Sequence, residues 1–196
     1  MNLKMKAVMF YGPKEIRLVE VPLPKPGPGE MLIKVGSALT CGTDFKAYRQ
    51  GHPVLLGKLP SLFGHELAGT VVEVGPGVKR FKTGDRVVAA NSAPCDDCFF
   101  CLRGQNQLCD DLKLHNGAYA EYNLLPAQIV KHNVYGLGDA WGLSFAHAAL
   151  AEPLSCAIHA AGLLGVTPGE TVAIIGSGTM SLLLIHALTA IGARIL

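Results

Sequence analysis

Apolar and polar residues alternate over short stretches in the first two thirds of the chain, a pattern typical of β-strands with one buried face. Residues 51–62 and the run of prolines and glycines at 22–29 read as turns and loops, because proline cannot donate to a strand ladder. A short helix is expected after Asp44, through Tyr48. Strands at this spacing predict a partly closed β-barrel. They are expected at residues 6–11, 16–21, 31–38, 65–74, 86–90 and 119–125.

After about residue 140 the pattern changes to longer runs rich in Ala and Leu. A helix is predicted over 141–164, with Glu152-Pro153 as a break or a new helix start. Thr171–Ile175 is an apolar strand of the kind that is buried on both faces of a parallel sheet. A helix over 182–191 and the first residues of another strand at 192–196 follow, so the pattern indicates the beginning of an α/β domain.

Composition narrows the class of protein. The chain has 196 residues, of which 49% are hydrophobic and 16% charged, enough for one globular domain or one and part of another. The net charge of +2 gives no reason to expect a nucleic-acid partner. No secretory h-region opens the chain, and the apolar stretches contain Gly, Pro or His, so neither a membrane span nor membrane binding is expected. The cytoplasm is the expected location.

Four of the six cysteines fall close together, at Cys95, Cys98, Cys101 and Cys109. Thiolates are soft ligands, and four of them suit a tetrahedral Zn²⁺ with no open position, which makes the predicted site structural. The alternative is a pair of disulfides, and it is disfavoured because nothing else indicates an oxidising compartment. A zinc ribbon would show two separated C-x2-C pairs, unlike this C-x2-C-x2-C-x7-C run.

A second set of metal-type residues consists of Cys41 and, 24 residues later, His65-Glu66. A thiolate, an imidazole and a carboxylate are suitable ligands for a catalytic zinc, which keeps one position open. Each residue alone is weak evidence, since a lone Cys or His near a strand usually belongs to the core or the surface. The separate four-cysteine cluster favours the metal interpretation.

The sequence resembles the zinc-containing medium-chain alcohol dehydrogenase family, in its polyol (sorbitol) and threonine dehydrogenase branch. The resemblance covers nearly the whole chain and implies a fold of the α/β class. A GroES-like barrel domain at 1–150, with its structural zinc lobe at 95–109, would precede an incomplete Rossmann domain at 151–196. The matching motifs are Cys41-Gly-Thr-Asp44, Gly64-His-Glu66 with Leu-Ala-Gly69, Val74-Gly-Pro-Gly-Val78, Gly84-Asp-Arg-Val87, the Cys95–Cys109 lobe, Gly117-Ala-Tyr-Ala-Glu-Tyr122, Glu152-Pro-Leu154 and the Gly176 turn.

The resemblance also implies roles for single residues. Cys41, His65 and Glu66 match the catalytic zinc site, with Glu152 as its further protein ligand and Cys156 as the rival for that place. Thr43 matches the hydroxyl that passes the substrate proton outward. Zinc, two ions per chain, and NAD or NADP are the implied cofactors. The expected cofactor contacts lie in the glycine turn, at Gly176, Gly178, Thr179 and Met180.

Two positions depart from the family pattern. Lys46 stands where many relatives carry the histidine at the outer end of the proton relay, and a surface charge is its expected role. Ser181 replaces the third glycine of the dinucleotide turn, where a side chain is expected to push the helix slightly outward. Other histidines, including His115, have no assigned chemistry.

The implied function is the reversible transfer of a hydride between an alcohol or polyol and NAD(P), by a homo-oligomer (dimer or tetramer). L-threonine 3-dehydrogenase is an alternative enzyme, and a zinc-stabilised scaffold or binding protein without catalysis is an alternative of another class. A Rossmann domain needs several parallel strands, so the 196-residue chain is expected to be a fragment without tight NAD(P) binding or turnover. The sequence predicts neither the substrate nor the preference between NAD and NADP.

Overall fold

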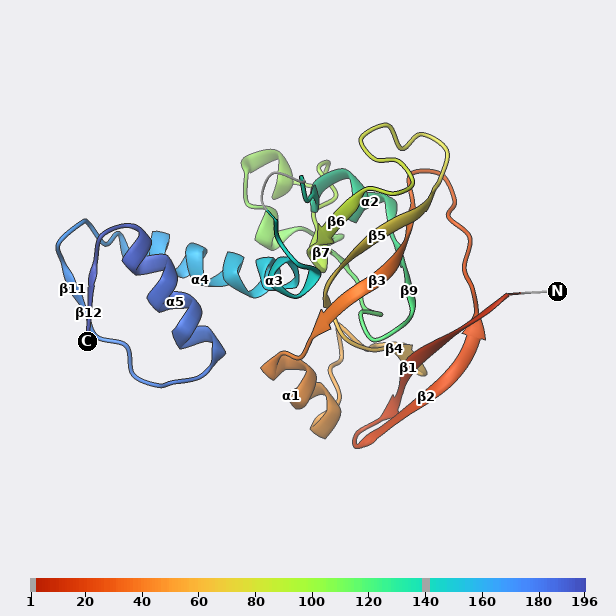
Figure 1. Ribbon diagram of the computed structural model, residues 1–196, viewed down its shortest axis with the longest axis horizontal. Helices are drawn as coiled ribbons and strands as arrows, with labels where there is room; N and C mark the ends of the chain where they lie inside the picture. The colour runs from red at the N-terminus through yellow and green to blue at the C-terminus, as the bar shows by residue number, and fades with distance from the viewer. Residues whose placement is uncertain (1–2, 139–141) are drawn as a thin grey trace. The chain divides into compact units, whose positions relative to one another are not determined.

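The computed structural model describes residues 3–138 and 142–196 and divides into two compact units, Met1–Ala149 and Leu150–Leu196 (Figure 1). The N-terminal unit is rich in strands. In chain order its elements are β1 (Lys4–Gly12), β2 (Glu15–Pro22), β3 (Met31–Leu39), α1 (Gly42–Gln50), β4 (Ser61–Leu62), β5 (Glu66–Val74), β6 (Arg86–Ala89), β7 (Ser92–Ala93), η1 (Cys101–Arg103), η2 (Asn106–Leu108), β8 (Lys113–Leu114), β9 (Tyr122–Leu125), α2 (Ala127–His132), β10 (Val134–Gly136) and α3 (Phe145–Ala149).

A five-stranded antiparallel sheet in the order β10-β6-β5-β3-β9 forms the body of this unit. A second sheet has the order β2-β1-β4. The two are joined where the Val8 amide donates to the Tyr119 carbonyl oxygen at 2.8 Å and where Ala7 bridges Ala120. The fold class expected from the sequence, a partly closed β-barrel in an α/β chain, is confirmed.

The inward faces of β3, β5 and β6 supply the main core. Met31, Ile33, Val71 and Val87 are fully buried there. Burying a side chain of this size contributes about 1.5–3 kcal/mol, so the sheet is held chiefly by alternating apolar positions. Within β3 the pairing with β5 shifts register twice, yet it ends with Leu39 opposite Glu66. That pairing fixes which residues meet at the end of the sheet.

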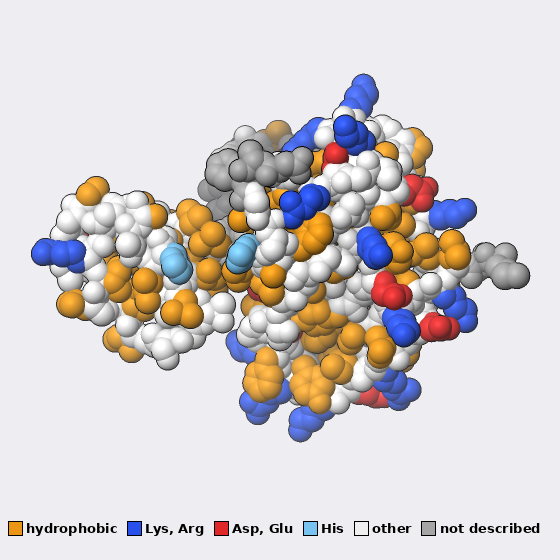
Figure 2. Space-filling view, in the orientation of Figure 1, with side chains coloured by type: hydrophobic (Ala, Val, Ile, Leu, Met, Phe, Trp, Pro, Cys, Tyr) orange, Lys and Arg blue, Asp and Glu red, His pale blue; other side chains and the backbone are white. Residues whose placement is uncertain are grey.

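The C-terminal unit contains α4 (Ala151–Leu164), β11 (Thr171–Val172), α5 (Thr179–Ala190) and β12 (Arg194–Ile195). β11 and β12 pair in parallel, as the pattern predicts, but β11 ends at Val172 and not at residue 175. Paired strands lie edge to edge, so β11 and β12 do not bury each other's faces. Ile175, which follows β11, is fully exposed. Several hydrophobic side chains lie on the visible face of this unit (Figure 2).

Several predicted boundaries are wrong. The predicted helix over 141–164 is two helices, α3 and α4. Of the two alternatives for Glu152-Pro153, the new helix start is confirmed, because α4 begins at Ala151 and both residues lie in its first turn. Proline is tolerated in a first helical turn because its missing N–H has no intrahelical acceptor there. Trp141, the first residue of the predicted helix, lies outside the described residues. The elements that the pattern missed are short: β4, β7, β8, α2, β10 and the two 3-10 helices, η1 and η2.

Among the described residues, no helix combines the length and the apolar character that a bilayer crossing requires. Acidic side chains lie among the basic ones on the face of the N-terminal unit that Figure 2 shows. Mixed charge of this kind agrees with the small net charge.

Candidate metal centres

The four predicted cysteine ligands lie together in a lobe between β7 and β8. One ligand atom from each, at Cys95, Cys98, Cys101 and Cys109, lies within 4.8 Å of the others. The sulfurs of Cys95 and Cys101 are 3.9 Å apart. This agrees with a tetrahedral ion, whose metal–sulfur bonds of about 2.3 Å separate its sulfurs by about 3.8 Å. None of the six cysteines forms a disulfide. The lobe therefore fits a four-coordinate thiophilic ion.

Backbone amides point at these sulfurs. The Cys101 amide lies 3.5 Å from the sulfur of Cys98, and the Cys95 amide lies 3.3 Å from that of Cys109. The Cys101 amide, followed by that of Asp110, lowers the pKa of Cys98 to about 6. The Asp97 side chain, hydrogen-bonded to Cys95, raises the pKa of that thiol to about 12. Crowded thiolates repel one another, so all four need a shared cation to be ionised together.

Asp96 fixes the start of the lobe. Its backbone has a φ of 75°, a left-handed conformation that aspartate tolerates better than most residues. Its carboxylate pairs with Lys131 on α2, and this hydrogen bond is the main cause that lowers the pKa of Asp96. The cysteine lobe is thus tied to a helix that packs on the main core.

The second predicted ligand set, Cys41, His65 and Glu66, also comes together. One ligand atom of each lies within 4.8 Å of the others. Their meeting follows from the sheet register, because Leu39 pairs with Glu66 and the chain beyond β3 continues beside His65. His65 and Glu66 are buried and Cys41 is half-buried. A sulfur, an imidazole nitrogen and a carboxylate oxygen placed in this way form a donor set that a divalent cation such as zinc can bind.

Cys41 is also the N-cap of α1. Its sulfur accepts from the Thr43 amide at 3.4 Å, and the Asp44 carboxylate accepts from the Cys41 amide at 2.9 Å. This reciprocal arrangement is a capping box, with a cysteine in the place of the usual serine or threonine. The cap gives the thiol a fixed direction at the start of the helix.

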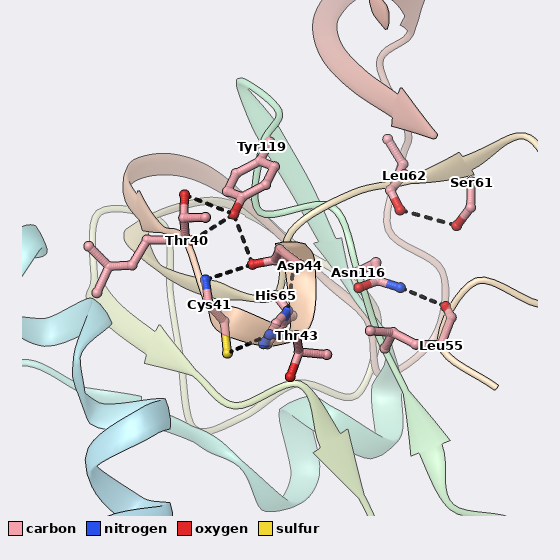
Figure 3. A network of polar contacts seen from close by, with 11 residues as sticks. Thr40, Cys41, Thr43, Asp44, Leu55, Ser61, Leu62, His65, Asn116 and Tyr119 are labelled. Atoms are coloured by element: carbon pink, nitrogen blue, oxygen red, sulfur yellow. Dashed lines mark hydrogen bonds and ion pairs between the residues drawn. The ribbon is translucent and has the colours of Figure 1, made fainter. Parts of the chain in front are cut away.

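Asp44 orients the imidazole of His65. The Nδ1 atom of His65 lies 3.0 Å from Oδ1 of Asp44, and both side chains are buried (Figure 3). Burial raises the pKa of Asp44, but the hydrogen bonds from His65, the Cys41 amide and Tyr119 outweigh it and leave the pKa below its ordinary value. An Nδ1 donor to a carboxylate fixes the tautomer with its lone pair on Nε2, as in many metal-binding histidines.

The remaining predicted site residues lie near the starts of three helices, α1, α4 and α5. Thr43 lies half-buried in the first turn of α1, and Lys46 is exposed on the same helix. Glu152 lies in the first turn of α4, and Cys156 lies one turn later on that helix. The dinucleotide turn leads into α5, with Gly176 at a φ of 123° and Gly178 as the N-cap, followed by Thr179 and Met180.

Two residues that sequence reasoning left without a role join the Cys41 cluster. Asp44 could have been found, because an acid three residues after an N-cap residue is the capping-box spacing. Tyr119 could not, since it lies 75 residues from its partner Asp44. A third residue, His115, has its Nε2 atom 2.7 Å from Oδ1 of Asn123.

His115 is desolvated, which lowers its pKa. The Asn123 hydrogen bond and Glu30 act in the opposite direction, and Lys113 adds to the lowering. His115 is thus hydrogen-bonded to Asn123, and its lowered pKa favours the neutral imidazole.

Comparison with known proteins adds the following findings. The family profile of the alcohol dehydrogenase GroES-like domain matches residues 27–134. The chain is 40% identical to L-threonine 3-dehydrogenase of Pyrococcus abyssi (strain GE5 / Orsay), over 98% of this chain and 55% of that protein. It is 36% identical to sorbitol dehydrogenase of Bacillus subtilis (strain 168), over 96% of this chain and 54% of that protein.

A solved structure is also similar to this chain. A Sinorhizobium meliloti 1021 protein assigned as a zinc-binding dehydrogenase, and bound to NADP, superimposes with a TM-score of 0.87 at 32% identity. The match covers 98% of this chain and 55% of that one. The chain thus spans about half the length of the curated relatives it matches.

Proposed function

This chain belongs to the family of alcohol dehydrogenase GroES-like domains, and from that membership we propose that it is part of a zinc-dependent oxidoreductase. The reaction is hydride transfer between an alcohol or polyol and NAD or NADP. The named relatives, a threonine and a sorbitol dehydrogenase, act as oxidoreductases on hydroxyl-bearing small molecules. The observation that carries the proposal is the convergence of Cys41, His65 and Glu66 at the end of the main sheet.

Two zinc sites are proposed per chain. The four-cysteine lobe would hold a structural ion, because four sulfurs complete a tetrahedron. Cys41, His65 and Glu66, with Glu152 as a further ligand, would hold the catalytic ion. The donor set fits, since sulfur, nitrogen and carboxylate oxygen are all zinc ligands and the ligand atoms already lie within 4.8 Å of one another.

A zinc ion in the second site supplies Lewis acidity, which favours loss of the hydroxyl proton of an alcohol. Thr43 would accept that proton on its hydroxyl and pass a proton on toward solvent. A nicotinamide cofactor, when bound, would supply the acceptor for the hydride of the carbinol carbon. Asp44 holds the His65 ring in one orientation and one tautomer. The burial of His65 and Glu66 keeps the floor of the site at low dielectric.

The turn before α5 is the proposed place for the cofactor pyrophosphate. Gly178 is the N-cap of α5 and supplies no side-chain cap, so amides of the first turn can bind an anion. Gly176 has a φ of 123°, which favours glycine. Residues 151–196 would then be the first part of a Rossmann domain and residues 1–150 the GroES-like catalytic domain.

L-threonine 3-dehydrogenase is the second candidate, and it is favoured by the 40% identity to the Pyrococcus abyssi enzyme. A zinc-stabilised scaffold needs only the four-cysteine lobe. The second donor set at Cys41, His65 and Glu66 would have no use in such a protein, so it disfavours the scaffold. We also propose a cytoplasmic protein, since none of the six cysteines is in a disulfide, and a homo-oligomer, dimer or tetramer.

The proposal is tested by metal analysis and assay of the intact protein purified without chelators. We expect two zinc ions per chain, one after Cys41→Ser, and NAD(P)H absorbance with one of L-threonine, sorbitol or a simple alcohol. Glu152→Ala should weaken the second zinc, and Cys156→Ser should retain it. A single zinc in the unaltered protein, together with rapid alkylation of Cys41, would contradict the enzyme and favour the scaffold.

A further inference from the structure

Tyr119 is held in place from several sides. Its amide donates to the Phe63 carbonyl oxygen at 3.0 Å, and its own carbonyl accepts from the Val8 amide at 2.8 Å. Its ring meets the edge of Phe63, with ring centroids 5.8 Å apart. The ring also lies over Gly64, where a Cβ added to the glycine would fall 2.8 Å from three of its carbon atoms. The tyrosine is therefore part of the rigid sheet junction.

From this position the hydroxyl of Tyr119 reaches the Cys41 cluster (Figure 3). It lies 2.9 Å from Oδ2 of Asp44, 3.0 Å from the Leu39 carbonyl oxygen and 3.2 Å from Oγ1 of Thr40. A phenol has one proton to donate. The ionised carboxylate is the strongest of the three acceptors and lies at the shortest distance. Tyr119 therefore donates its hydrogen bond to Asp44, and the Thr40 hydroxyl can donate a hydrogen bond to the phenolic oxygen.

Asp44 is the point at which two restraints meet. Its Oδ2 atom accepts from Tyr119 and from the Cys41 amide, and its Oδ1 atom lies against Nδ1 of His65. A buried carboxylate held by donors on Oδ2 cannot rotate without losing a hydrogen bond, which in a buried site is costly. The position of the carboxylate thus restrains the direction in which Nδ1 of His65 points.

We propose that Tyr119 is a positioning residue for the Cys41 metal site, whose hydroxyl holds Asp44 so that Asp44 holds His65 as a ligand. The inference rests on the proposed function, because it assumes a metal ion bound by His65. It goes beyond that function in assigning to a tyrosine from a distant segment the control of metal affinity. The hydroxyl of Tyr119 acts on the ligand set through its hydrogen bond to Asp44.

The test is Tyr119→Phe in the intact protein, which keeps the ring and removes the hydroxyl. Loss of a partner that is hydrogen-bonded directly to a ligand costs about 10- to 100-fold in metal affinity. Tyr119 lies one hydrogen bond further out, so we expect an increase of up to about 10-fold in the zinc dissociation constant of the Cys41 site, measured by chelator competition. The four-cysteine site is the internal control and should keep its affinity. Tyr122→Phe is the matched tyrosine control. With cobalt in the Cys41 site, the visible absorption bands should shift in Tyr119→Phe alone.

A double-mutant cycle separates positioning from general destabilisation. In an Asp44→Asn background, Tyr119→Phe should change zinc affinity much less than in the unaltered protein, because both act through one path. If Tyr119→Phe fails to fold, Thr40→Val should still weaken the site, by a smaller factor. Unchanged zinc affinity and cobalt spectrum in a folded Tyr119→Phe variant would overturn the inference and leave the proposed function intact. A protein that binds one zinc before any substitution overturns both.

Discussion

Gly64→Ala provides a quantitative test of how the Cys41 cluster is built. Gly64 is buried and has a φ of 83°, and an added Cβ would fall 2.8 Å from three ring carbons of Tyr119. An L-residue in this backbone region costs about 1–2 kcal/mol, and overpacking a rigid site costs about 1–3 kcal/mol more. Together they predict a loss of about 2–5 kcal/mol in the free energy of unfolding. The Tyr119 ring must also move, so the zinc affinity of the Cys41 site should fall.

Gly77→Ala is the matched control, because Gly77 has a φ of 86° and an added Cβ would have no atom within 4 Å. It should lose only the backbone part, about 1–2 kcal/mol, and keep its zinc affinity. The assay is urea unfolding at saturating zinc, with chelator competition on the folded protein. Equal stability losses in the two variants would show that the Tyr119 ring does not fill the space beside Gly64, and the reasoning would be refuted.

Three further predictions follow from the sites. Cys98→Ser should lower the melting temperature and the zinc content, because a structural ion contributes folding energy directly; thermal unfolding with metal analysis checks this. In the intact protein, His65→Ala should abolish the proposed dehydrogenase turnover with a much smaller change in melting temperature, and wild-type turnover would disprove the assignment of His65 as a ligand. His115 has a lowered pKa in the folded state, so the unfolded chain takes up its proton first and stability should fall as pH drops below about 6.5. His115→Gln should flatten that part of a stability–pH curve, and an unchanged slope would exclude this origin.

The long strands can be predicted from the sequence because they are runs rich in Val, Ile, Leu and Met that are bounded by Gly and Pro turns. Strands are expected at residues 31–38 and 65–74, and β3 and β5 cover nearly these ranges. The predicted strand over 119–125 begins only at Tyr122, since residues 117–119 donate their amides to Gly64 and Phe63 and not to a ladder. The two-residue strands β7 and β8 are too short to show any period.

The ligand residues can be predicted in the same way, because metal-type side chains are few and their spacing is informative. The geometry agrees with both sets, which lie within 4.8 Å among themselves, while their metal assignment stays a proposal. Pairing across distant segments cannot be predicted. The bond from Tyr119 to Asp44 depends on the junction between the two sheets, and no local pattern encodes the position of that junction.

The strand order β10-β6-β5-β3-β9 also bears on how fast the N-terminal unit folds. β5 pairs with β3 and β6, which are close to it in the chain, but β9 pairs with β3 across the whole cysteine lobe. A metal ion that cross-links Cys95 to Cys109 roughly halves the flexible span between β6 and β9. Halving a loop reduces its closure cost by about 0.6 kcal/mol, which corresponds to a two- to threefold faster docking of β9. A metal ion in the four-cysteine lobe would then speed the pairing of β9 with β3 during folding. Stopped-flow refolding should therefore be slower in the presence of a chelator.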